Sequence, residues 1–191
     1  MGKAFLVKGP EGKPFLITSA HLFYFYEEKL EKIAWADALT GDPIFESRSS
    51  VGNIGKNPSL DPMQLATDFA VFESSGNAKI RVLEIDPRKL PEIGEDIGLP
   101  YASGESGAGS EIIRGKITKA NNEFIEAILD QEIKIRARSG SPILEMKNNK
   151  VIGILTGGAA GDGKSIIVFC GSSHLVKHLK ENAKKPLVPL K

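Results

Sequence analysis

The sequence contains one cysteine, Cys170, among 191 residues. No internal disulfide can form, and a zinc site made of four thiolates, or of thiolates and imidazoles, lacks its ligands. The fold must instead be held together by its hydrophobic core. A hydrophobic content of 41% over this length is enough for one compact unit.

Long apolar runs are also missing. No stretch approaches the roughly 20 apolar residues that cross a bilayer, so we predict no membrane span. Residues 1–3 lead straight into an expected strand, without the apolar segment of a secretion signal. The location is left open: cytoplasmic, or secreted or periplasmic if a leader has been removed.

Charge of one sign is not in excess, because 25 lysines and arginines are balanced by 24 acidic residues. A chain with so little net charge has no overall field that would attract a polyanion, so we predict no nucleic-acid partner. Composition does not predict the oligomeric state.

The sequence is rich in short β-type runs bounded by turn residues. One helix is expected at residues 172–183, which begin with serines and carry lysines in the later turns. We therefore predict a mostly β chain with a C-terminal α-helix. The expected strands are residues 4–7, 14–18, 69–72, 79–84, 111–118, 124–129, 132–136, 142–146, 151–155 and 165–169.

Two loop-like segments suggest how the chain is organised. Residues 41–62 are rich in Gly, Ser, Asn and Pro and are expected to be a loop, and residues 86–94, which contain Pro87 and Pro91, are expected to be a connector. We therefore predict a single unit, residues 1–191, with an N-terminal half at 1–88 and a C-terminal half at 89–191.

Three polar residues lie beside apolar strands in the order histidine, aspartate, serine. Residues 18–21 read Thr-Ser-Ala-His, residues 67–69 read Thr-Asp-Phe, and residues 138–143 read Arg-Ser-Gly-Ser-Pro-Ile. Acyl transfer by a serine hydroxyl requires a base, an acid that orients the base, and N–H donors for the oxyanion. These segments are therefore candidates for a hydrolytic site of this kind.

In these segments the chain resembles the trypsin-like, chymotrypsin-fold serine proteases, especially the bacterial members without disulfides. The resemblance implies two antiparallel β-barrels of the chymotrypsin type with substrate held between them. It makes His21 the general base, Asp68 the orienting acid and Ser139 the nucleophile, with the N–H groups of Ala137 and Ser139 as the oxyanion hole. The implied activity is a serine endopeptidase that cleaves protein or peptide substrates through an acyl-enzyme, without a metal or cofactor.

The apolar run that ends in Thr156, Gly157 and Gly158 is similar to the family strand that lines the substrate cleft. By this similarity these three residues bind substrate, Gly158 pairs with the substrate backbone, and Thr156 also supports the aspartate. The segment before the serine, residues 133–135, has no aspartate to receive a basic side chain. We therefore expect an uncharged primary pocket.

Two residues of the serine segment depart from the family pattern. Ala137 stands where many members have glycine, in a backbone conformation that a Cβ opposes at a cost of roughly 1–3 kcal/mol. Arg138 replaces the aspartate that pairs with a newly cut N-terminus in members activated by cleavage, so we expect no such switch. These departures leave a second interpretation open, a catalytically impaired protease fold that binds peptides or proteins.

Ser106 and Asp61 are the alternatives to Ser139 and Asp68. Residues 104–107 read Gly-Glu-Ser-Gly, which is closer to the family's Gly-Asp-Ser-Gly than residues 137–140 are. Ser106 is not followed by the proline and strand that come after Ser139, and Asp61 is the weaker candidate for the acid. Ser139 and Asp68 are therefore preferred.

A second motif, Gly-x4-Gly-Lys-Ser at residues 158–165, matches the phosphate-binding loop of nucleotide-binding proteins. In those proteins a helix begins at the Lys-Ser pair, so that its N-terminal N–H groups face the phosphates. Here the next residues, 166–169, are Ile-Ile-Val-Phe, a β-type run. We therefore predict a glycine-rich hairpin loop and not a nucleotide site.

Overall fold

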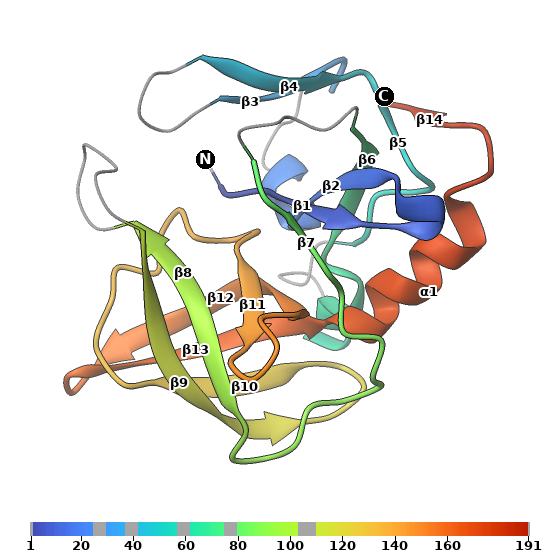
Figure 1. Ribbon diagram of the computed structural model, residues 1–191. Coiled ribbons are helices and arrows are strands. Elements are labelled where there is room, and N and C mark those ends of the chain that lie inside the picture. The colour runs from blue at the N-terminus through green and yellow to red at the C-terminus, as the bar shows by residue number, and fades with distance from the viewer. Residues whose placement is uncertain are drawn as a thin grey trace.

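The computed structural model of the chain describes residues 2–24, 30–36, 42–56, 62–74, 80–102 and 110–190. Figure 1 shows two β-rich bodies, one formed by the N-terminal part and one by the C-terminal part of the chain, with helix α1 (Ser172–Asn182) beside them. The expected mostly β chain with a C-terminal helix is confirmed.

The N-terminal half is built on a four-stranded sheet in the order β6-β2-β1-β7. Its neighbours pair antiparallel except for β1 and β7, which are parallel. Strands β3 and β4 form a separate antiparallel pair, and β5 pairs with β14 from the C-terminal end of the chain. The strands are β1 (Phe5–Lys8), β2 (Pro14–Thr18), β3 (Ile33–Ala36), β4 (Pro43–Ser47), β5 (Ser49–Ser50), β6 (Ala70–Glu73), β7 (Val82–Leu83) and β14 (Val188–Pro189).

Three short 3-10 helices complete this half: η1 (Pro10–Gly12), η2 (Ala20–Phe23) and η3 (Pro62–Thr67). η2 begins just after β2, and η3 ends just before β6. Because β2 and β6 are paired antiparallel, the end of β2 lies beside the start of β6, with Thr18 opposite Ala70. The sheet therefore brings η2 and the residues that follow η3 together.

The C-terminal half is a closed barrel in the strand order β10-β13-β12-β11-β8-β9, in which β9 and β10 close the ring. Inward-facing apolar side chains fill it, among them Ile97, Leu99, Ile143 and Phe169, none of which is exposed. The strands are β8 (Asp96–Ala102), β9 (Ser110–Ala120), β10 (Ile125–Leu129), β11 (Pro142–Glu145), β12 (Val151–Gly161) and β13 (Lys164–Gly171).

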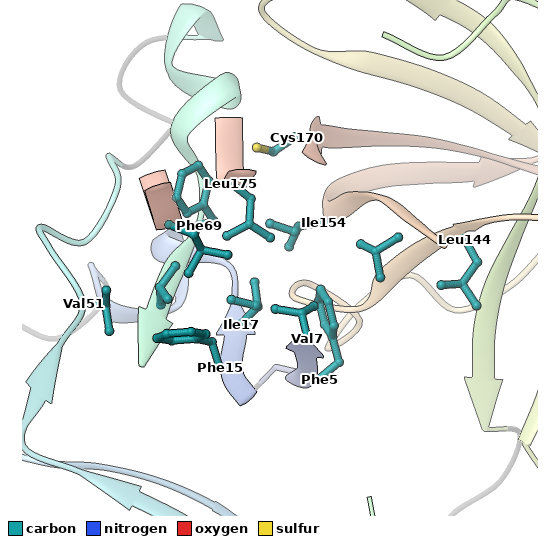
Figure 2. Close-up of a cluster of buried hydrophobic side chains, with 13 residues drawn as sticks. Phe5, Val7, Phe15, Ile17, Val51, Phe69, Leu144, Ile154, Cys170 and Leu175 are labelled. Carbon is teal, nitrogen blue, oxygen red and sulfur yellow. The ribbon is translucent and has the colours of Figure 1, made fainter. Parts of the chain in front are cut away.

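The two halves and the helix share one cluster of buried side chains. Figure 2 shows Val7 and Ile17 from the N-terminal sheet in the same cluster as Ile154 from β12 and Leu175 from α1. All four side chains are fully buried, and each such burial contributes roughly 1.5–3 kcal/mol. The apolar contact between the halves is therefore a large part of what fixes their relative position.

A charged connector adds a polar link between the halves. Arg88 lies 2.6 Å from Asp86 and 2.8 Å from Glu95 on the connector, and 3.4 Å from Glu145 on β11. Burial raises the pKa of Asp86, but the hydrogen bonds and charge of Arg88 outweigh it and hold that pKa below its ordinary value. The guanidinium thus adds ion pairs to the hydrogen bonds of 2.8 Å that join Asp86 and Glu84 to the backbone of Val151 on β12.

The glycine-rich motif at residues 158–165 lies at the end of a β-hairpin, where the expected loop is only the turn at residues 162–163 and residues 158–161 belong to β12. It joins β12 to β13, which starts at Lys164, so no helix follows the Lys-Ser pair. The Ser165 side chain is buried, and its Oγ accepts a hydrogen bond of 3.0 Å from the N–H of Ile133. A phosphate-binding loop is excluded, because its serine would have to face solvent and a helix would have to begin there.

Two expected elements were wrong. Residues 132–136 form no strand, because the N–H of Ile133 is donated to a side chain and the N–H of Arg138 closes a turn onto the carbonyl of Ile135. Within the expected loop at 41–62, β4 and β5 are strands that pair with β3 and β14. Distant partners supply the backbone hydrogen bonds that local composition does not indicate.

Replacing Arg88 with methionine should lower the free energy of unfolding by roughly 1–3 kcal/mol, because the largely buried Glu145 and Asp86 lose their cation. The depressed pKa of Asp86 stabilises the fold above the ordinary value of 3.8, and this contribution is lost as pH falls below it. In urea unfolding, the difference in free energy of unfolding between wild type and Arg88→Met should therefore be largest at neutral pH and should decrease in acid. The control, Lys32→Met, breaks an exposed pair and should change little; equal effects of the two variants would contradict the role of Arg88.

Candidate active site

His21 and Asp68 are joined by two hydrogen bonds. The Asp68 carboxylate accepts from the His21 backbone N–H at 2.9 Å through Oδ1, and lies 2.8 Å from His21 Nδ1 through Oδ2. Because an ionised carboxylate only accepts, Nδ1 carries the ring proton and Nε2 is left as the acceptor. Asp68 is fully buried, so the ring is held in one orientation by a group shielded from water.

The local sequence explains this placement. Strand β2 ends at Thr18. The 3-10 helix η2 begins two residues later, at Ala20, and His21 lies in its first turn. Asp68 follows η3, and its neighbour Phe69 is buried in the shared core. The paired β2 and β6 thus bring together two residues that are 47 positions apart in the sequence.

Cys170, on barrel strand β13, bonds to the segment that precedes Asp68. Its Sγ donates to the carbonyl of Ala66 on η3 at 3.0 Å. Burial, and next the negative charge of Asp68, raise the pKa of the Cys170 thiol well above its usual value. The only cysteine of the sequence is therefore a neutral, buried packing group.

The turn before Ser139 has a special backbone. The N–H of Arg138 donates to the carbonyl of Ile135 at 3.0 Å, and Ala137, the third residue of that turn, has a φ of +66°. Gly140, after the serine, has a φ of +88°. The strained conformation expected at Ala137 is present, at a cost of about 1–2 kcal/mol for a residue with a Cβ.

The N–H groups of Ala137 and Ser139 donate to no acceptor among the residues that the structure describes. A turn with a positive φ at its third residue turns the central peptide over relative to the common type I turn. The two expected oxyanion donors are thus not used by the described part of the fold.

The Ser139 hydroxyl donates to the carbonyl of Thr156 on β12, at 3.0 Å. The hydroxyl of Thr156 itself is buried without a hydrogen-bond partner among the described residues. The hydrogen bond expected from Thr156 to Asp68 is therefore not formed, which corrects that part of the sequence-based account. Thr156 therefore bonds to the site through its backbone carbonyl.

One carbonyl links the histidine segment to the serine segment. The Leu155 oxygen accepts from Ser19 Oγ at 2.9 Å and from the N–H of Gly140 at 2.8 Å. Ser19 is two residues before His21, and Gly140 follows Ser139. The sequence did not predict this link, because nothing near Ser19 indicates that its hydroxyl bonds to a carbonyl 136 residues away.

Lys3 makes a second link between the same segments. Its N–H donates to the carbonyl of Ser139 at 2.8 Å, and its own carbonyl accepts from Thr18 Oγ1 at 2.6 Å. The space is tight, since a Cβ added to Gly140 would lie 2.1 Å from the Lys3 carbonyl oxygen. The first residues of the chain are therefore part of the support of the serine turn.

Arg138 stacks on the ring of Tyr101, with the guanidinium carbon 4.0 Å from the ring centroid. Tyr101 belongs to β8 of the barrel. In the cleavage-activated members of the family that this chain resembles, the position of Arg138 is an aspartate. Here the stacking on Tyr101 holds the Arg138 side chain beside Ser139. Nothing in the sequence singled out Tyr101, because a lone tyrosine in a strand is ordinary.

Gly157 and Gly158 lie in the outer part of β12. This part pairs with β13 on one side, whereas β11 pairs only with residues 151–154. A Cβ at Gly158 would meet the carbonyl of Ile166 at 2.2 Å and the Ile135 side chain at 3.0 Å, while one at Gly157 would meet nothing. The described strands thus leave one edge of this segment unpaired beside Ser139.

The two alternatives named from the sequence, Ser106 and Asp61, lie outside the described residues. Within the described part of the chain, no group of three or more His, Cys, Asp and Glu side chains could hold a metal ion. The described helices include none that is both long and apolar enough to cross a membrane.

A scan against protein-family models and a search of curated proteins both found no match. Solved structures do match. Human heparin binding protein is 12% identical with a TM-score of 0.64, over 96% of this chain and 86% of that one. A serine endoprotease from Yersinia pestis is 17% identical with a TM-score of 0.56, over 94% of this chain and 56% of that one.

An inactivated protease paralogue from the scabies mite also matches, at 14% identity and a TM-score of 0.55, over 96% of this chain and 94% of that one. The chain has the trypsin-like fold. At these identities the likeness shows the fold alone, and the trypsin-like fold includes both a named endoprotease and an inactivated paralogue. Activity must be argued from the residues.

Substitutions at Ala137 test the backbone conformation of the turn before Ser139. Valine at this position should lower the free energy of unfolding by about 1–3 kcal/mol, because a β-branched side chain opposes a φ of +66°. Glycine should be tolerated or slightly stabilising. The control, Ala36→Val in strand β3, should stay within about 0.5 kcal/mol. Equal tolerance of valine at both positions, measured by thermal unfolding, would contradict the turn conformation.

Proposed function

We propose that this chain is a serine endopeptidase that hydrolyses peptide bonds through an acyl-enzyme. Ser139 is the nucleophile, His21 the general base and Asp68 the acid that orients it. The observation that carries the proposal is the buried Asp68 carboxylate, which holds both the ring and the backbone of His21. The Leu155 carbonyl ties the segment of His21 to the segment of Ser139.

In the proposed reaction, His21 Nε2 takes the hydroxyl proton as Ser139 Oγ attacks the substrate carbonyl. The N–H groups of Ala137 and Ser139 donate to the resulting oxyanion. The imidazolium, stabilised by Asp68, then gives the proton to the leaving amine, and water repeats the cycle on the ester. No metal or cofactor takes part in this scheme.

The hydroxyl has to leave the carbonyl of Thr156 before it can donate to His21. We propose that the substrate backbone pairs with the unpaired edge of β12 at Gly157 and Gly158, as an added strand. Its N–H groups would then compete for the same row of carbonyls that the serine hydroxyl uses at rest. Substrate binding would in this way free the nucleophile.

A second candidate function is a protease fold that binds peptides without cleaving them. Two observations favour it: the alanine at the positive-φ position of the serine turn, and the serine hydroxyl bonded to the Thr156 carbonyl. One of the matching structures is itself an inactivated paralogue. The binding mode would be the same strand addition at β12.

A fluorophosphonate probe separates the two functions. The wild-type chain should be labelled on Ser139, and Ser139→Ala should abolish labelling because the attacking oxygen is gone. His21→Ala should slow labelling by about a thousandfold or more, since the hydroxyl loses its base. The control, Ser173→Ala on the helix, should label like the wild type, and no labelling of any variant would favour the binding function.

Hydrolysis should also depend on the buried carboxylate that bonds to His21. Asp68→Asn should lower the rate by about 10⁴ at neutral pH, since the ring loses the acceptor that fixes its tautomer. A kcat/KM of the Asp68→Asn variant within about tenfold of the wild type would contradict the role of Asp68.

A further inference from the structure

The segment that leads to Ser139 carries a row of cations, of which Lys134 and Arg136 face solvent. Lys134, Arg136 and Arg138 alternate with Ile133 and Ile135. Ile133 is 6% exposed and belongs to the barrel core, whereas Lys134 and Arg136 are exposed. The apolar residues therefore face inward and the charges face outward.

This orientation is fixed by three contacts. The N–H of Ile133 donates to Ser165 Oγ at 3.0 Å, and the carbonyl of Ile135 accepts the turn bond from Arg138. The Ile135 side chain packs on β12, within 3.0 Å of where a Cβ on Gly158 would lie. The segment cannot rotate to bury its cations without breaking these contacts.

Lys3 brings a fourth cation to the same turn. Its backbone is bonded to the Ser139 carbonyl. Burial, and next the repulsion from Arg138, lower the pKa of the Lys3 ammonium. The charges of Lys3 and Arg138 therefore act on each other.

Three of these four cations have no carboxylate within ion-pair distance among the described residues. They are Lys3, Lys134 and Arg136. Asp68 is buried against His21, and Glu132 accepts a hydrogen bond of 3.3 Å from the N–H of Gly163 at the tip of the hairpin. Lys134 and Arg136 are thus exposed cations that no carboxylate of the described residues pairs with.

We infer that this site takes acidic peptide segments, whose carboxylate side chains on either side of the bond held at Ser139 contact Lys134 and Arg136. The inference rests on the proposed function and names its substrate class. It refines the expectation of an uncharged primary pocket, since the selecting charges surround the serine turn. A peptide fits better than a nucleic acid, because the edge of β12 offers backbone pairing to an extended chain.

The test digests a synthetic library of 14-residue peptides in which acidic, basic and neutral residues are equally frequent, and maps the cut sites by mass spectrometry. Asp and Glu should be enriched beside the cut by roughly two- to twentyfold over Gln and Asn, as expected for two exposed charge pairs. The enrichment should shrink in high salt. It should vanish in the double variant Lys134→Gln, Arg136→Gln, and persist in the control Lys177→Gln, Lys180→Gln on helix α1. Thermal unfolding verifies that both double variants fold.

Binding is measured in parallel on Ser139→Ala, which cannot cleave, with fluorescein-labelled peptides of equal length that carry four Glu or four Gln. Tighter binding of the Glu peptide, lost with the Lys134 and Arg136 replacements, supports the inference even if the wild type cuts nothing, in which case the proposed function alone fails. Cutting without acidic enrichment, equal binding of the two peptides, or tighter binding of a single-stranded oligonucleotide than of the Glu peptide overturns the inference and leaves endopeptidase activity to be judged by itself.

Discussion

The candidate site depends on one carbonyl oxygen, that of Leu155 on strand β12. It accepts from Ser19 beside His21 and from Gly140 beside Ser139. His21 and Ser139 come from different halves of the chain, so a shared acceptor adds a direct constraint on their distance to the packing of the halves. The link through Lys3, bonded to both Thr18 and Ser139, acts in the same direction. These polar contacts between the halves thus lie at the place where the proposed chemistry needs precision.

The apolar core and the polar links have different tasks. The shared cluster around Val7, Ile17, Ile154 and Leu175 provides most of the attraction between the halves, but apolar contact is not directional. The hydrogen bonds to Leu155 and Lys3 add the direction, since each has a narrow range of favourable geometry. The same strand, β12, supplies Ile154 to the core, Leu155 to the link and Thr156 to the serine hydroxyl. Three successive residues therefore serve packing, alignment and the site.

Much of the fold, and the pairing of His21 with Asp68, could be predicted from local pattern and from the family resemblance. The expected helix matches α1, and the order of His21, Asp68 and Ser139 pointed to residues of which the first two are in fact bonded. Other features depend on contacts between distant residues, which no local pattern encodes. Ser19 to Leu155 and Arg138 to Tyr101 are contacts of this kind, and so is the pairing of β5 with β14. The hydrogen bond from Thr156 to Asp68 was wrongly expected because a similar sequence position does not fix which way a hydroxyl turns.

The central claim is that His21, Asp68 and the turn of Ser139 form one working site, and a crystal structure of the protein after reaction with a peptidyl phosphonate tests it most directly. The account predicts phosphorus bonded to Ser139 Oγ, a phosphonyl oxygen within hydrogen-bond distance of the N–H groups of Ala137 and Ser139, and His21 still bonded to Asp68. A protein that forms no adduct, or an adduct whose oxygen lies away from both N–H groups, would contradict it.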